Sequence, residues 1–371
     1  MEQRERLKNN LDTIMCKPTE LSSRPASAGG VTARQIFFAA TSFILGAWAF
    51  IKVNSISGPA FEPIIAACTN PEFTSPAEFA AKTGYHIYEP KVGLVAFNML
   101  VCLITQFLLE LRETPPAGLL VWGGVIVVSL PLAISNTVAA GRKGVKGPVR
   151  YPTIIGLLSQ LLGISVIYPM IWVPSYIFSG SKLGAPVTNK RIIYATCATM
   201  PGVILTYLVF TANTDGSVWT YAAGILGGPG LVLCGLIMYT DRSESMAATN
   251  ENISKCSNAI QSAYSIVGAV SFAFWICLVA VAYGAYGFEH DKLWNDIWVE
   301  AGPSVAFMTI DTGVLFLGAL LFIGYENGLE ALKALLVTPF VGPGASCCMA
   351  LKELESAATS KLLNGDNKKE V

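Results

Sequence analysis

The chain has 371 residues, of which 53% are hydrophobic and only 13% are charged, and its mean hydropathy is +0.52. A soluble domain usually carries about a quarter charged residues, so this composition excludes an ordinary water-soluble fold. The formal net charge is zero, which excludes the general attraction to nucleic acid that a strongly basic chain has.

Residues 1–32 form a polar leader that is rich in arginine and lysine. The leader lacks the apolar core of 7–15 residues that marks a signal peptide. We therefore expect a disordered cytosolic leader, followed by a first apolar run that acts as an uncleaved anchor.

About eight apolar runs follow, each near the roughly 20 residues that are needed to cross a bilayer core. They do not alternate in polarity, as the strands of a membrane barrel do. The sequence predicts an all-α, polytopic membrane bundle of about eight transmembrane helices over residues 33–341. The runs are 35–53, 92–111, 118–139, 153–178, 192–212, 218–239, 262–286 and 305–324.

Three connecting or terminal segments have their own predictions. The longest loop, 54–90, contains apolar pieces (Phe61–Ala67 and Phe79–Ala81) that are too short to span, and we expect them to be interfacial or re-entrant. Segment 287–304 carries Trp294 and Trp298, which suit the aromatic belt of a membrane interface. Residues 342–371 are predicted to be a loose polar tail.

Basic residues favour a topology with both termini in the cytosol. With eight spans, Arg112 lies on the cytosolic side, whereas the cluster Arg142, Lys143, Lys146 and Arg150 lies on the opposite side. This cluster contradicts the positive-inside rule, so a miscounted span before residue 140 is the alternative.

Asp311 is the most informative residue, because it lies inside the apolar run 305–324. An ionisable group in hydrocarbon is costly and usually faces a cavity, a partner or a substrate. A carboxyl group in apolar surroundings tends to keep its proton, so it suits a general acid or a proton relay. Glu110 and Glu326 lie near span ends, where we expect them to reach the interface.

No metal or cofactor site is predicted. His86 and His290 are far apart, and the nine cysteines form no CxxC pair. Cys347–Cys348 is a candidate for palmitoylation, although plain thiols are the simpler interpretation. The sequon at Asn252 falls in a loop assigned to the cytosol, so we expect it to be unused. The motifs of P-loop, α/β-hydrolase and zinc-protease sites are absent.

Four stretches together carry a family resemblance: Gly147–Phe178, SISGPAFEP (55–63), WTYAAGILGGPG (219–230) and TIDTG (309–313). They resemble the fungal transmembrane terpene cyclases of meroterpenoid clusters, of the ascofuranone and macrophorin type. The resemblance implies proton-initiated cyclisation of a farnesyl or epoxyfarnesyl chain on an aromatic polyketide. It also implies a lipophilic prenylated substrate, and no redox or metal cofactor.

The residues themselves supply the candidates for such a site. Asp311 is the favoured acid, and Glu62 on the 54–90 loop is its rival. A cation gains roughly 0.5–2 kcal/mol over an aromatic face, and Trp172, Tyr176, Trp219 and Tyr221 are candidate cation stabilisers. For any one of these rings, packing or anchoring at the interface is the simpler role.

Two other functions fit the same residues. A secondary transporter or exporter of a hydrophobic metabolite would use the kinked spans and the buried acid, although the chain lacks visible repeated halves. A non-catalytic membrane scaffold would use the long loop and the tail. For the cyclase, we expect an endoplasmic reticulum membrane and neighbouring pathway enzymes.

Overall fold

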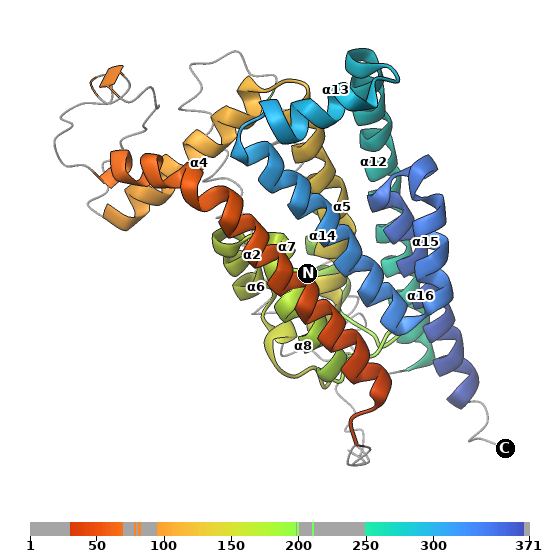
Figure 1. Ribbon diagram of the computed structural model, residues 1–371. Coiled ribbons are helices and arrows are strands. Elements are labelled where there is room, and N and C mark those ends of the chain that lie inside the picture. The colour runs from red at the N-terminus through yellow and green to blue at the C-terminus, as the bar shows by residue number, and fades with distance from the viewer. Residues whose placement is uncertain are drawn as a thin grey trace, which may run out of the picture.

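The computed structural model describes residues 30–69, 95–197 and 249–366, together with 78, 81, 82, 199 and 210. The regular structure of these residues is helical, without strands, which confirms the all-α expectation for them. Four helices are long and apolar enough to cross a membrane by length and composition. They are α2 (Ala33–Thr69, over Ala33–Pro59), α5 (Ala117–Gly141), α12 (Asn250–Tyr286) and α14 (Pro303–Glu326), and they lie side by side in Figure 1.

The remaining apolar runs have different outcomes. Run 92–111 lies in α4 (Val95–Glu113), which is not one of these four helices. Run 153–178 is broken into short helices. Runs 192–212 and 218–239 fall largely outside the described residues, apart from α9 (Asn189–Cys197) and two single positions. The total of eight spans therefore stays a prediction.

The run predicted as one span over 153–178 is instead a helical hairpin. It consists of α6 (Pro152–Leu162), α7 (Ile164–Ile167), the π-helix η2 (Tyr168–Trp172) and α8 (Val173–Phe178). Gly163 forms the turn, with a φ of +90° that favours glycine. The two ends of the hairpin lie close together: the amide of Lys146, which precedes the hairpin, donates to the carbonyl of Ser179, which follows it, at 2.9 Å. The segment therefore enters the bundle and returns to the same end.

The last part of the chain forms a second hairpin, where the sequence predicted a loose tail. Helix α15 (Gly328–Val341) is followed by α16 (Pro343–Asp366), which packs on α12. The turn is Gly342, again with a positive φ, of +83°. Its neighbour Gly344 lies directly against the carbonyl of Val127, in the middle of α5, so a side chain would clash there. This close approach explains why the helix begins with small residues.

The two ends of the bundle differ in charge. We call the end where α2 begins, and where α5 and α14 end, the basic end (Figure 1). There Arg34 donates to the carbonyl of Tyr325 at 2.5 Å and Gln35 to that of Ile177 at 3.4 Å. The loop from Arg142 to Arg150 lies at this same end, which corrects the predicted topology. The physical reason is that α2 runs from the basic end to the opposite end and α5 runs back. Helix α4, which lies between them in the chain, does not cross the bundle again.

The opposite end, which we call the acidic end, carries the C-terminal turns of α4 and the short helices α13 (His290–Asn295) and η4 (Asp296–Glu300). Trp294 and Trp298 are exposed there, with ring centroids 5.7 Å apart. Arg112, which was assigned to the side of the termini, lies at this acidic end. The apolar piece Phe61–Ala67 is also not a separate re-entrant segment, because α2 continues through Pro59 and Pro63 to Thr69. Phe79–Ala81 falls mostly outside the described residues.

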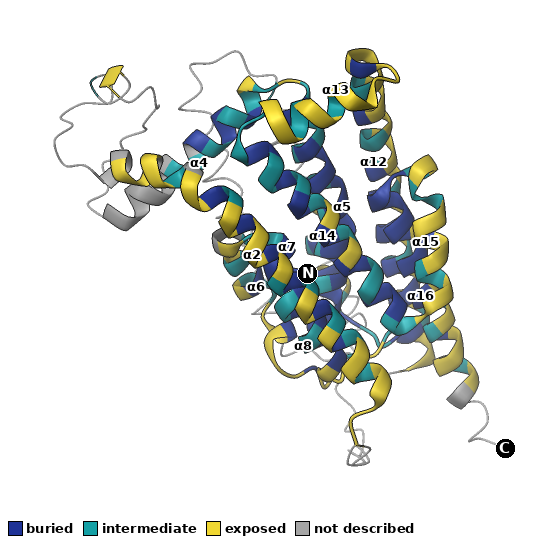
Figure 2. Cartoon of the chain, in the orientation of Figure 1, coloured by how far each residue is buried: buried dark blue, intermediate teal, exposed yellow. Residues whose placement is uncertain are grey.

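Burial separates the inner and outer faces of the helices. In Figure 2 the buried residues form the inner sides of α5, α14 and α16, whereas α2, α12 and α15 show long exposed stripes. The stripe on α15 consists of apolar side chains: Leu329, Leu332, Leu335, Leu336 and Phe340. Exposed leucine and phenylalanine are favourable where the surroundings are lipid rather than water. The fold is therefore compatible with a membrane protein.

Candidate functional site

Asp311 lies nine residues into α14, and only 4% of its surface is exposed. Its carboxylate oxygen Oδ1 accepts a hydrogen bond from the hydroxyl of Ser165 on α7. The other near groups are Gly163 and the ring of Phe307, since a Cβ at Gly163 would lie 3.5 Å from Oδ1 and 3.6 Å from Cζ of Phe307. The predicted acid therefore faces the tip of the 152–178 hairpin inside the bundle.

The hairpin tip presents hydrogen-bond donors to this carboxyl group. Gly163 precedes the first helical residue of α7, and its carbonyl accepts from the amides of Val166 at 3.3 Å and Ile167 at 3.2 Å. The backbone amide of Ser165 also interacts with the carboxyl group of Asp311. Both donors stabilise a carboxylate, the form that remains after the acid gives up its proton. Asp311 and Ser165 thus form an acid with a fixed orientation.

Three phenylalanine rings lead from Asp311 toward the acidic end. Phe307 on α14 makes an edge-to-face contact with Phe107 on α4, at a centroid distance of 5.4 Å. Phe107 in turn lies 6.3 Å from Phe61, near the end of α2. All three rings are half-buried. We call these residues the phenylalanine series.

The predicted cation stabilisers Trp172 and Tyr176 belong to a different cluster. Tyr168, Trp172 and Tyr176 stack along one face of η2 and α8, with centroid distances of 5.0 and 5.3 Å, and Phe322 packs edge-on against them. These rings are at most 2% exposed. The stack fills the core between the hairpin and α14. Trp219 and Tyr221 fall outside the described residues.

The two remaining carboxyl candidates lie apart from Asp311. Glu62 is exposed on the last turns of α2, at the side of the acidic end. Glu110 was expected to reach the interface, but its carboxylate accepts from the hydroxyl of Ser304 at 2.6 Å and from the backbone amide of Ser304 at 3.2 Å. Glu110 therefore caps the first turn of α14, where a negative charge is favourable.

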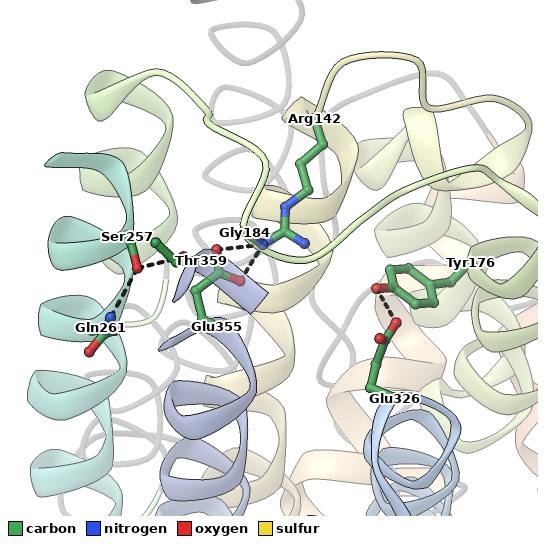
Figure 3. Close-up of polar contacts among 8 residues, drawn as sticks. All are labelled: Arg142, Tyr176, Gly184, Ser257, Gln261, Glu326, Glu355 and Thr359. Carbon is green, nitrogen blue, oxygen red and sulfur yellow. Dashed lines mark hydrogen bonds and ion pairs between the residues drawn. The ribbon is translucent and has the colours of Figure 1, made fainter. Parts of the chain in front are cut away.

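A second polar cluster lies at the basic end (Figure 3). Arg142 Nη2 and Glu355 Oε2 form a buried ion pair at 2.5 Å, and the amide of Gly184 donates to the other carboxylate oxygen at 3.1 Å. Figure 3 shows Tyr176 and Glu326 beside this pair, joined by a hydrogen bond of 2.7 Å. The sequence predicted that Glu326 would reach the membrane interface, whereas its carboxylate accepts this hydrogen bond from Tyr176. The ion pair joins the end of α5 to α16, and the hydrogen bond joins α8 to α14, so both pairs have a structural role.

Sequence reasoning missed several residues of both clusters. Ser165 and Gly163 belong to a run that reads as one continuous apolar span, so nothing in the pattern marks the break between them. Phe107 and Phe307 have no local signal, because phenylalanine is common in any span. Glu355 and Arg142 are 213 residues apart, and their pairing follows only from the tertiary fold.

The described residues contain no group of three or more histidine, cysteine, aspartate or glutamate side chains that could hold a metal ion. Comparisons with protein-family models, curated proteins and solved structures find no match for the chain. The function is therefore argued from the residues around Asp311.

Proposed function

We propose that the protein is a membrane-bound terpene cyclase in which Asp311 starts the reaction as a general acid. The observation that carries the proposal is the buried carboxyl group of Asp311, which is oriented by Ser165 and lies beside an aromatic ring. A reaction that passes through carbocations needs a proton donor, apolar walls and the exclusion of water. Two features of Asp311 support the proposal: its low exposure of 4%, and the apolar ring of Phe307 beside it.

The proposed reaction is an isomerisation. The carboxyl group of Asp311 donates its proton to the epoxide oxygen, or to the terminal alkene, of a farnesyl chain on an aromatic polyketide. The epoxide C–O bond breaks while the neighbouring π bond attacks the developing cation, and a new C–C bond forms. Loss of a proton, or attack by the phenol oxygen with loss of its proton, ends the sequence. One proton is taken up and one is released, so no redox cofactor is required.

The cellular setting belongs to the same proposal. We place the protein in the endoplasmic reticulum as a multi-pass protein with about eight spans. A prenylated phenol partitions into the bilayer, so the protein's acid that protonates it should lie within the bilayer as well. Neighbouring enzymes of a fungal meroterpenoid pathway would supply the prenylated precursor and use the cyclic product.

The test is conversion without added cofactor. Microsomes that contain the protein are given a farnesyl-phenol and its terminal epoxide, and products are followed by chromatography and mass spectrometry. We expect a new product of unchanged mass that is lost in Asp311→Asn and retained in Glu62→Gln, a matched change of an exposed carboxyl group. If the product survives Asp311→Asn and disappears in Glu62→Gln, the acid assignment is wrong.

A secondary transporter of a small hydrophobic metabolite is the second candidate, and the 152–178 hairpin favours it. Transporters often use broken helices whose ends face a binding site inside the membrane, and the break at Gly163 faces Asp311. In this case Asp311→Asn should abolish pH-driven flux of the metabolite in sealed vesicles. Wild-type flux without any isomerised product would replace the cyclase proposal.

A further inference from the structure

We propose that the phenylalanine series is the binding site of the isoprenoid chain, with the terminal isoprene unit at Asp311 and the aromatic head group near Phe61. The inference rests on the proposed cyclase function and gives its substrate a location and a direction. It also replaces Trp172 and Tyr176 as the rings that meet the substrate.

The contacts of the three rings form a continuous series across three helices. Phe61 comes from α2, Phe107 from α4 and Phe307 from α14, and these helices contact one another. The ring of Phe307 lies beside Gly163, which also lies beside Oδ1 of Asp311. An unsaturated chain along these rings would therefore end at the acid. Its π bonds would meet aromatic rings throughout, and a cation would be stabilised where it lies over a ring face.

Partial exposure distinguishes this series from the Tyr168–Trp172–Tyr176 stack. The three phenylalanine rings are half-buried, so an apolar chain from the surrounding bilayer has access to them. The tryptophan stack is covered by Phe322 and by the neighbouring helices, and its rings are at most 2% exposed. A substrate ring would have to displace close-packed side chains there, which costs more than binding beside rings that are partly open.

The depth of Asp311 below the acidic end determines the direction in which the isoprenoid chain lies. Asp311 lies eight residues after Pro303, the first residue of α14, which at 1.5 Å per residue is about 12 Å below the acidic end. Phe61 lies just beyond the apolar segment Ala33–Pro59 of α2. The polar phenol is thus most favourably placed near Phe61, at the interface. The apolar tail, whose terminal double bond or epoxide is protonated first, extends inward to Asp311.

The direct test is photo-crosslinking of the full-length protein in membranes. Two farnesyl-phenol probes are used, one with a diazirine on the terminal isoprene unit and one with a diazirine on the phenol. The inactive Asp311→Asn variant holds the probes without turnover, and unlabelled farnesyl-phenol serves as the competitor. Crosslinked peptides are identified by mass spectrometry.

We expect the terminal probe to label peptides that contain residues 163–167 or 303–311, and the phenol probe to label the end of α2. Reversed labels would overturn the direction of the chain. Labels on residues 168–178, or no competed label in folded protein, would overturn the site. If the probes label the expected peptides but the wild-type protein forms no cyclic product, the binding site of the isoprenoid chain is supported and the cyclase function is rejected.

Substitutions give an independent measurement on the active enzyme. Phe107→Leu and Phe307→Leu keep an apolar side chain but remove the ring. We expect at least a fivefold loss of competed crosslinking in the Asp311→Asn background and, in the active enzyme, a larger share of partly cyclised products. Phe322→Leu is the matched control, since its ring contacts the tryptophan stack instead. If Phe322→Leu changes the products and the two other variants do not, the inference is wrong.

Discussion

Three carboxyl groups inside the bundle have three different partners, and the partner indicates the role. Glu355 pairs with the guanidinium of Arg142, so its charge is neutralised and its position fixed. Glu326 accepts from the hydroxyl of Tyr176 near the end of α14. Asp311 is held by Ser165, a neutral donor, beside apolar groups. A neutral partner leaves a carboxyl group able to exchange its proton, whereas an ion pair does not. Asp311 and Glu326 both have neutral partners, but Glu326 is the last residue of α14, whereas Asp311 lies inside the helix. Asp311 is therefore the one we assign to chemistry.

Ser165 should act as a positioning residue for this acid. A hydrogen bond to a group that becomes charged contributes about 1.5–3 kcal/mol, so we expect Ser165→Ala to lower kcat by roughly tenfold or more. KM should change less than kcat, because the hydrogen bond of Ser165 acts on the acid itself. Ser159→Ala is the matched control, since Ser159 Oγ donates to Ile155 within α6 at 2.8 Å. Equal losses in both variants would indicate a general defect of the hairpin.

The adjacent thiols of Cys347 and Cys348 are fully buried in α16, at 0% and 1% exposure, so palmitoylation does not fit this structure. Burial raises the pKa of the Cys347 thiol to about 12, and a thiol reacts as its thiolate. At pH 9 the thiolate fraction of Cys347 should therefore be only about 0.1%, against roughly three quarters for a thiol with an ordinary pKa near 8.5. We expect an exposed cysteine introduced as Lys143→Cys to be alkylated at pH 9 roughly 100-fold faster than Cys347, or more, in detergent-solubilised protein. Comparable alkylation rates, measured by mass spectrometry, would contradict the buried position.

At the scale of the element, two prolines explain the irregular helix of the 152–178 hairpin. The amide of Val173 donates to the carbonyl of Tyr168, five residues earlier, as in a π-helix. The same pattern would pair the carbonyl of Pro169 with residue 174, which is also proline and has no amide hydrogen. The hydroxyl of Ser42 on α2 donates to this carbonyl instead, at 2.6 Å. The irregular helix is thus stabilised from outside, by a side chain of α2.

The turn at Gly163 is the most demanding backbone position of the hairpin. With φ at +90° and ψ at 139°, it is in a region that costs other residues about 1–3 kcal/mol. We expect Gly163→Ala to lower the thermal midpoint of the protein in detergent and to weaken catalysis, because the tip carries Ser165. Gly156→Ala in α6 is the control, since nothing lies within 4 Å of a Cβ there and alanine favours a helix. A stable Gly163→Ala protein would show that the turn can change its conformation.

Hydropathy predicted the elements well and their paths poorly. Apolar length was sufficient to find α5 and α14, because a straight span needs only one long apolar run. It did not distinguish the 152–178 hairpin from a span, since both are long, largely apolar runs and glycine is common in either. It also did not predict α16, because small and polar residues such as Gly344 and Ser346 suit close helix packing only when the partner α5 is known.

The same limit applied to the candidate site. Asp311 was found because a carboxyl group in an apolar run is anomalous by itself. Its partners Ser165 and Phe307 are ordinary residues whose importance comes from the tertiary contacts. Trp172 and Tyr176 were chosen for ring chemistry alone, and the structure places them in the packed core between the hairpin and α14. Composition indicates which residues are available, whereas the backbone path decides which of them meet.

At the scale of the whole molecule, charge is distributed unevenly between the two ends. The basic end carries Arg34, Arg142, Lys143, Lys146, Arg150, Lys182, Lys190, Arg191 and Lys255, on helix ends and loops, together with Glu251, Glu326, Glu330 and Glu355. The acidic end carries Glu110, Glu113, Glu289, Asp291, Asp296 and Glu300, with Arg112 and Lys292. Basic residues favour the cytosolic side of a membrane. The 142–150 loop, which opposed this rule in the eight-span count, now supports it.

The orientation that follows can be measured with introduced cysteines in sealed microsomes. We expect Lys146→Cys to react with a membrane-impermeant maleimide from outside the vesicle, because the basic end should face the cytosol. Lys292→Cys, at the acidic end, should react only after the membrane is opened with detergent. The wild-type protein serves as the control for its native cysteines, of which Cys256, Cys347 and Cys348 are buried. The reverse pattern would place the basic end in the lumen, and the phenylalanine series would then receive its substrate from the cytosolic leaflet.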